Sequence, residues 1–316
     1  MKYVNLGKSG LKVSELCLGC MSYGKGQMHA WTLSHEDSFP FFRRAIEHGI
    51  NFFDTADVYS EGDSEIVTGK ALREFARRDD VVVATKFFAP TGAGPNERGA
   101  SRKHIMAAVD ASLKRLGMDH IDLYIQHSWD ATVPIEETLQ AFDDLVRSGK
   151  VLHIGASNYK AWQLAKALNI QERNGWTRFI SMQVQYNLIY RNIEDELIPM
   201  CIDEGLGVTP WSALARGFLA GNRSRVGEGG TQRAQTDKLA DQLYYRESDF
   251  AVQARLAQVA AARGVPPMQV ALAWNVSRPG ISSPIIGATK LEQLDQSVAA
   301  LGIALSEEEV KLLEQM

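Results

Sequence analysis

Cysteine is scarce in this chain, which limits the chemistry that it can carry. Three of the 316 residues are Cys, too few for a disulfide scaffold and typical of a reducing compartment, so we expect a cytoplasmic protein. Cys17 and Cys20 form a C-x-x-C pair, but Cys201 is remote and no second pair of metal-ligand type follows. Because the pair lies inside an apolar run and not at a helix start, we interpret it as structural and expect no metal site.

Long apolar runs and a strong charge of either sign are also missing. No continuous apolar stretch approaches the ~20 residues of a membrane span, and no signal peptide precedes the first expected strand. A formal net charge of −4 argues against general binding to nucleic acids or anionic membranes. With 45% hydrophobic and 23% charged residues, the composition is that of an ordinary globular protein.

A third absence is the glycine-rich fingerprint of classical dinucleotide-binding domains. Gly92-Ala93-Gly94 has a superficial likeness to it, but Pro95 follows, the third glycine is absent and no helix is expected to open there. We therefore interpret this segment as a flexible loop.

Short apolar runs alternate with amphipathic segments along the whole chain. Strands are expected at 15–20, 50–54, 81–85, 121–126, 151–156, 180–184, 206–211 and 283–286. Helices are expected at 36–48, 63–76, 102–116, 136–148, 160–174, 194–204 and 306–315, with a helical pair at 249–278. This alternation predicts an α/β fold, a single (β/α)8 TIM barrel over residues 1–316 with an N-terminal β-hairpin in 1–14 and extra C-terminal helices.

Two segments are too long to be simple connections. Residues 87–100 and 217–246 are rich in glycine and follow expected strands, so we expect lids, binding loops or disorder above the barrel. The second segment also carries Arg223, Arg225 and Arg233, which would attract phosphate groups. We expect it to become ordered around an anionic ligand.

Four polar residues stand at or just beyond the ends of expected strands. Asp54, Lys86 and His127 each close an apolar run, and Tyr59 follows Asp54 by five residues. The carboxyl ends of parallel strands meet at one rim of a barrel, so these side chains should converge. A phenol with a pKa near ~10 becomes a better proton donor beside an ammonium group, a carboxylate can hold that ammonium charged, and a histidine can orient a substrate oxygen.

Each of these residues has a simpler interpretation when it is taken alone. Asp54 could cap a helix, Tyr59 could be a packed aromatic, and His127 could be a satisfied core histidine. Lys86 is harder to explain in this way, because a lysine at the end of a valine-rich buried strand is costly unless its charge is paired. The four together indicate a catalytic site.

Several stretches of the chain resemble the aldo-keto reductase superfamily in matching order from residue 1 to about 312. They read GINFFDTADVYSEGDSEIVTGKAL, VVVATK, LKRLGMDHIDLYIQH, GKVLHIGASN, PWSALARGFL and PIIGATKLEQLDQSV. Within the superfamily the chain is most similar to bacterial members related to aryl-alcohol dehydrogenases and potassium-channel β-subunits. The resemblance implies reduction of aldehydes or ketones, with Tyr59 as general acid, Lys86 lowering its pKa, Asp54 supporting Lys86, and His127 polarising the carbonyl.

The resemblance also implies NADPH or NADP+ as cofactor, bound in extended form across the barrel rim. Ser157, Asn158 and Gln183 would hold the carboxamide, and Trp211 would stack on the nicotinamide ring. The other residues implied in cofactor binding are Cys20, Met21 and Asp54 near the nicotinamide, Ser212, Leu214, Arg216 and Gly217 near the pyrophosphate, and Gly287, Thr289, Lys290, Gln293, Gln296 and Ser297 at the adenosine phosphate. At the adenosine-phosphate end, the backbone donors of a helix start together with Lys290 could hold a 2′-phosphate.

For the substrate, Tyr23, Phe88 and Trp129 are candidates for the lining of an aromatic pocket that would accept a small-molecule carbonyl compound, although each could equally be core. We expect a monomer or a homo-oligomer. One alternative is a regulatory barrel that senses redox state through its cofactor. Another is a Schiff-base aldolase using Lys86, which Asp54 disfavours because an aldolase amine must be neutral to attack.

Overall fold

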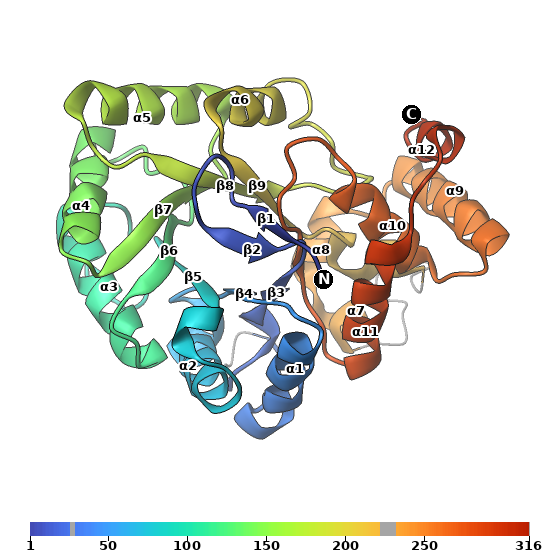
Figure 1. The fold of residues 1–316 in the computed structure, drawn as a ribbon, viewed down its shortest axis with the longest axis horizontal. Coiled ribbons are helices and arrows are strands. Elements are labelled where there is room, and N and C mark those ends of the chain that lie inside the picture. Colours follow the sequence, from blue (N-terminus) through green and yellow to red (C-terminus); the bar gives the residue numbers. More distant parts are fainter. Residues whose placement is uncertain (26–28, 222–231, 316) are drawn as a thin grey trace.

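A parallel sheet curls around the centre of the protein, and helices cover its outside (Figure 1). The structure is a computed structural model that describes residues 1–25, 29–221 and 232–315. The strands are β3 (Cys17–Gly19), β4 (Phe52–Asp54), β5 (Val82–Phe87), β6 (Ile121–Gln126), β7 (Val151–Ser157), β8 (Phe179–Gln185), β9 (Gly207–Trp211) and β10 (Ile285–Ile286). Their order in the sheet is β10-β3-β4-β5-β6-β7-β8-β9, and every neighbouring pair is parallel.

The sheet is a nearly closed barrel. A bridge between Val208 of β9 and Ile281, just before β10, brings the last edge next to the first. The predicted (β/α)8 fold is therefore confirmed, and each expected strand lies within a few residues of its predicted position.

The surrounding helices are α1 (His35–Glu47), α2 (Asp63–Phe75), α3 (Arg102–Leu116), α4 (Ile135–Arg147), α5 (Ala161–Asn174), α6 (Leu197–Glu204), α7 (Gln232–Thr236), α8 (Lys238–Leu243), α9 (Glu247–Arg263), α10 (Pro267–Val276), α11 (Leu291–Ala299) and α12 (Glu307–Leu313). Local signals explain several ends. The Ser101 hydroxyl accepts from the His104 N–H at the start of α3, and Gly117 ends that helix at φ +62°, where a side chain would be strained. Within the described residues, no helix has the length and hydropathy of a membrane span.

The N-terminal hairpin closes the bottom of the barrel, as predicted. Strands β1 (Tyr3–Asn5) and β2 (Lys12–Ser14) pair antiparallel. Leu6 and Val13 of the hairpin are fully buried against Phe52, Leu123 and other apolar residues inside the barrel. The apolar plug at this end leaves the opposite rim, at the carboxyl ends of the strands, for polar side chains.

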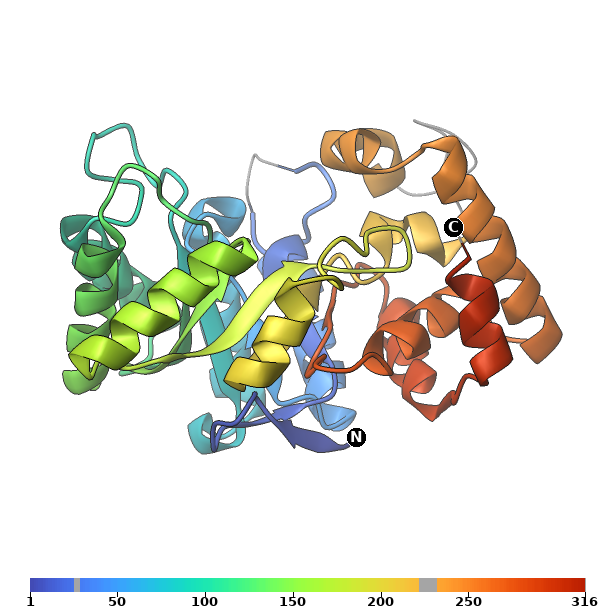
Figure 2. The ribbon, with the colours of Figure 1, turned by 90° about the horizontal axis from the view of Figure 1, so that it is seen from above.

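The segment 217–246 contains more regular structure than the sequence suggested. The 3-10 helix η4 (Ala215–Ala220) opens it, and α7 and α8 follow, so the expectation of a loop throughout was wrong for these parts. Arg223 and Arg225 lie outside the described residues. Phe218, Tyr244 and Leu256 share a separate apolar core with α10, and in Figures 1 and 2 helices α9, α10 and α12 lie together at one side of the barrel.

Candidate active site

The period of two along a strand explains why three polar residues face the same interior. On β5, Val82 and Ala84 belong to the apolar core inside the barrel, so Lys86 continues that face. The same alternation carries Leu123 and Ile125 of β6 on to His127, and Phe52 of β4 on to Asp54. The polar members come last along each strand, and they therefore meet above the apolar core.

Lys86 is the centre of the group. Its Nζ donates to Asp54 Oδ1 at 2.6 Å, to the Thr55 carbonyl at 2.7 Å and to the Tyr59 hydroxyl at 3.3 Å. These three bonds use all the donors of an ammonium group, and the side chain is 0% exposed. The His127 ring meets the Tyr59 ring edge to face, with 5.8 Å between centroids. The structure thus brings together the four residues expected to be catalytic.

Burial and charge set the protonation of these groups. Burial disfavours the charge on Lys86, but Asp54 and Tyr59 outweigh it and raise the Lys86 pKa, so the amine stays charged. Burial also raises the pKa of Tyr59, and the charge of Lys86 only opposes this rise. The expected lowering of the Tyr59 pKa by Lys86 is therefore present, but the effect of burial is larger. Burial, reinforced by Lys86, lowers the pKa of His127 to about 3, so its imidazole is neutral.

Amide side chains hold the second layer of the site. Gln183 of β8 donates its Nε2 to Asp54 Oδ2 at 2.9 Å, which occupies the carboxylate oxygen that Lys86 does not bind. Asn158 donates to the His127 carbonyl at 3.0 Å and accepts from the Trp211 indole N–H at 3.0 Å. Gln183 thus holds the Asp54 carboxylate, and the Asn158 amide links the main chain at His127 to the Trp211 ring.

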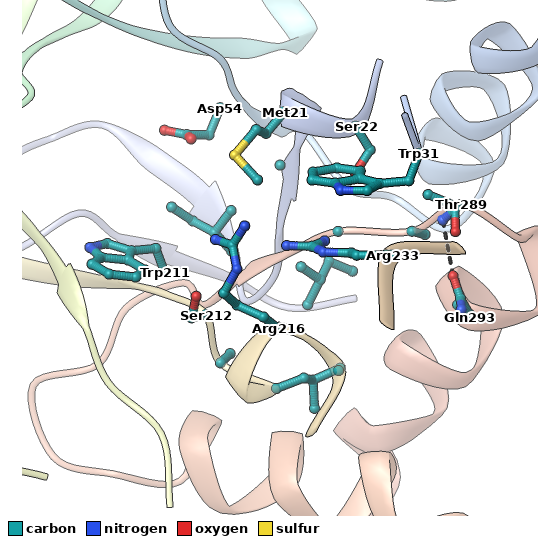
Figure 3. A pocket seen from close by; sticks show the side chains of 18 of the residues that line it. Met21, Ser22, Trp31, Asp54, Trp211, Ser212, Arg216, Arg233, Thr289 and Gln293 are labelled. Atoms are coloured by element: carbon teal, nitrogen blue, oxygen red, sulfur yellow. Dashed lines mark hydrogen bonds between the residues drawn. The ribbon is translucent and has the colours of Figure 1, made fainter. Parts of the chain in front are cut away.

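A cavity of about 600 Å³ opens directly above these residues. It runs from Asp54, Tyr59 and His127 at one end to Thr289, Lys290 and Gln293 at the other. Figure 3 shows Arg216 and Arg233 pointing into it between Met21 and Trp31 on one side and Trp211 and Ser212 on the other. The expected cofactor residues that line the cavity are Met21, Asp54, Asn158, Gln183, Trp211, Ser212, Leu214, Arg216, Gly217, Gly287, Thr289, Lys290 and Gln293.

Four expected cofactor residues lie outside this lining. Cys20 is fully buried with its thiol near the Leu18 carbonyl, and Ser157 is buried at the end of β7. Ser297 donates to the Gln293 carbonyl within α11, and Gln296 donates to Glu292 one turn away. Their side chains are engaged locally within the protein.

The start of α11 carries a side-chain cap. The main-chain N–H groups of Thr289 and Lys290 both donate to the Gln293 side-chain oxygen, at 2.9 and 3.2 Å (Figure 3 marks the first). The two N–H groups that directly precede the helix are therefore engaged by a side chain of its first turn. An anion that used these two N–H groups would have to displace the Gln293 amide.

The three residues expected to contact substrate do not line the cavity among the described residues. Tyr23 is 0% exposed, packs on Phe41 and Phe42, and donates its hydroxyl to the Ala288 carbonyl, so it is a core residue. Trp129 packs edge-on against Tyr159. Phe88 is partly buried just beyond β5. The expectation of an aromatic pocket made by these residues is not supported by their positions.

Sequence reasoning missed Trp31 and Asp237. Trp31 lines the cavity, and the Arg233 guanidinium lies 4.3 Å from the centre of its ring. The Nε atoms of Arg216 and Arg233 donate to the same Asp237 oxygen at 2.7 and 3.0 Å. Asp237 is 4% exposed and caps α8, which orients two cationic side chains at one wall. The excess of arginine in 217–246 was a sequence signal for the basic wall, but it did not indicate Trp31 or Asp237.

Comparison with known proteins finds relatives that match nearly the whole chain. The profile described as the aldo/keto reductase family matches residues 15–316. Versiconal hemiacetal acetate reductase of Aspergillus parasiticus is 41% identical over 100% of this chain and 96% of its own length. An aldo-keto reductase of Fusarium vanettenii is 38% identical over 99% of this chain and 90% of its own length. A candidate aryl-alcohol dehydrogenase of Schizosaccharomyces pombe is 39% identical over 99% of this chain and 95% of its own length. These relatives are fungal, so the expected bacterial branch gains no support.

Proposed function

Because the chain belongs to the aldo/keto reductase family, we propose that it is an NADPH-dependent oxidoreductase that reduces aldehydes or ketones to alcohols, with Tyr59 as general acid. The observation that carries the proposal is the buried Lys86, which binds the Asp54 carboxylate at 2.6 Å and the Tyr59 hydroxyl at 3.3 Å. A charged amine shared between a carboxylate and a phenol is suited to proton transfer at that phenol.

The residues along the cavity fit an extended dinucleotide. The cavity volume of about 600 Å³ lies within the usual range for ligand and cofactor sites. Trp211 offers a ring for stacking beside the catalytic group, Arg216 and Arg233 offer positive charge in the middle, and Lys290 offers it at the far end. A bound nicotinamide cofactor would supply the hydride. Lys290 is our candidate for reading the 2′-phosphate that distinguishes NADPH from NADH.

Tyr59 would give its proton to the carbonyl oxygen of the substrate. Burial keeps Tyr59 protonated at neutral pH, and the neighbouring Lys86 charge favours the phenolate left after transfer. His127, neutral because its pKa is lowered to about 3, can donate one ring N–H to the same oxygen without adding charge. Asp54 acts through Lys86, whose charge it supports.

Replacing Tyr59 with Phe tests the proposal. We expect kcat for aldehyde reduction to fall by about 10²- to 10⁴-fold, the contribution typical of a general acid, while the Kd of NADPH changes little. Tyr3→Phe is the matched control, because Tyr3 is 51% exposed on the hairpin at the other end of the barrel. Turnover close to that of the native protein in Tyr59→Phe would remove Tyr59 from the mechanism.

The aldolase alternative is disfavoured by the environment of Lys86. Its amine is held in an ion pair that raises its pKa, whereas attack on a carbonyl needs the neutral form. Borohydride trapping with carbonyl compounds should therefore leave Lys86 unmodified. A regulatory barrel with incidental turnover would use the same residues, and the measured kcat separates it from an efficient reductase.

A further inference from the structure

Asp57 is a buried acid that the proposed mechanism does not use. It lies three residues after Asp54 and two before Tyr59, in the turn that wraps around Lys86, and it is 3% exposed. Among the described residues, neither of its carboxyl oxygens has a hydrogen-bond partner. Its main-chain N–H donates to the Lys86 carbonyl at 3.0 Å. The main chain of Asp57 is therefore bonded to the main chain of Lys86.

The neighbours of Asp57 do not neutralise it. Glu65 of α2 is 0% exposed, and its oxygens accept from Thr85 at 2.5 Å and from Arg115 at 2.6 Å. The Arg115 charge is thus directed to Glu65. Tyr124 of β6 is also fully buried with an unpartnered hydroxyl, and its pKa is raised by burial and further by the charges of Asp57 and Glu65.

An unpartnered carboxylate in such surroundings is costly, so the site favours the neutral acid. Burial raises the pKa of Asp57 to about 7, and the charge of Glu65 adds to the rise. The charges of Arg115 and Lys86 and the nearby N–H of Val58 oppose it. Asp57 therefore changes its charge close to neutral pH, in the turn between Asp54 and Tyr59.

We propose that Asp57 is a positioning residue of the proposed reductase, whose charge state sets how strongly the Lys86 ammonium acts on the Tyr59 hydroxyl. All three Lys86 donors are already engaged with Asp54, Thr55 and Tyr59, so Asp57 acts through its field and not through a bond. When Asp57 loses its proton to solvent, a second negative charge is present in the turn that contains Tyr59. Less of the Lys86 field then favours the Tyr59 phenolate, and Tyr59 becomes a weaker acid.

The inference rests on the proposed function, and the pH dependence of kcat for aldehyde reduction tests it. Between about pH 5.5 and 9, native kcat should fall with a midpoint of about 7, by about two- to fivefold. Asp57→Asn and Asp57→Leu, which cannot ionise, should both lack this step while the KM for NADPH stays unchanged. Asp110→Asn, an exposed matched control, should keep it. A step of native size in both Asp57 variants would overturn the proposal.

A second measurement does not depend on turnover. The protein is labelled with carbon-13 at lysine Cε, and the Lys86 signal is assigned by its loss in Lys86→Met. In the native protein this signal should shift with a midpoint near pH 7, and in Asp57→Asn it should not. A native Lys86 signal without that step would overturn the inference. The step together with no reduction of any carbonyl compound would instead reject the proposed function and leave the coupling of Asp57 to Lys86 in place.

Discussion

The ion pair between Asp54 and Lys86 should be among the most consequential contacts in the protein. Its 2.6 Å bond joins side chains that are 4% and 0% exposed. Removing one partner of a buried pair leaves an uncompensated charge, which costs about 3–5 kcal/mol. We expect Asp54→Asn to lie near the lower end, because Lys86 keeps its bonds to Thr55 and Tyr59. Lys86→Met should lie higher, since Asp54 keeps only the Gln183 amide.

The double variant distinguishes a true pair from two independent residues. With both charges absent, no buried charge is left alone, so the loss of stability should not exceed that of Lys86→Met alone. Equilibrium unfolding in urea, followed by circular dichroism at neutral pH, gives the free energies of unfolding by linear extrapolation. A double-variant loss equal to the sum of the two single losses would refute the reasoning.

The chain offers a matched control for this cycle. Lys150 Nζ and Asp110 Oδ1 also lie 2.6 Å apart, but their side chains are 38% and 59% exposed. Water screens such a pair, so Asp110→Asn and Lys150→Met should each cost about 0–1 kcal/mol. The comparison holds the two residue types and the N–O distance constant, while the exposure of the side chains differs.

Three further predictions concern protonation and ligand binding. Because the pKa of His127 is lowered to about 3, the unfolded chain binds a proton that the folded protein refuses. Stability should therefore fall as pH drops from about 6.5 towards 3, and His127→Asn should flatten this part of the thermal-unfolding profile. Lys290→Ala should weaken NADPH by about 1.5–3 kcal/mol and spare NADH in fluorescence titrations, whereas an equal loss for both would show that Lys290 does not read the 2′-phosphate. Trp31→Ala should raise the Kd of NADPH by about three- to fivefold through lost support of Arg233, with Trp162→Ala, outside the cavity, as a control that leaves it unchanged.

Much of the fold and the catalytic group could be predicted from local patterns. Short valine-rich runs, serine caps and glycine stops act over a few residues, so the strands and helices of the barrel were expected close to where they lie. The alternation of sides along a strand then predicted that Asp54, Lys86 and His127 face the barrel interior. Once parallel strands are assumed, the last inward residue of each strand must reach the same rim.

Other features depend on segments that the fold brings together from distant parts of the sequence. Trp31 and Asp237 join Arg216 and Arg233 at one wall only because the loop after β3 faces the segment after β9. Tyr23 lies four residues after β3, where a substrate-pocket residue was expected, but packing by α1 buries it. No local pattern distinguishes these outcomes.

The protonation states also separate what the sequence predicts from what the tertiary structure decides. The sequence placed an ammonium beside a phenol and so determined the sign of the influence of Lys86 on Tyr59. Whether that influence or burial dominates the pKa of Tyr59 depends on how much water the folded chain excludes, and here burial dominates. The raised pKa of Asp57 has the same origin, because burial raises it and the charge of Glu65 on α2 adds to the rise. Residue types determine which charges are possible, and desolvation by the tertiary structure decides which of them are present.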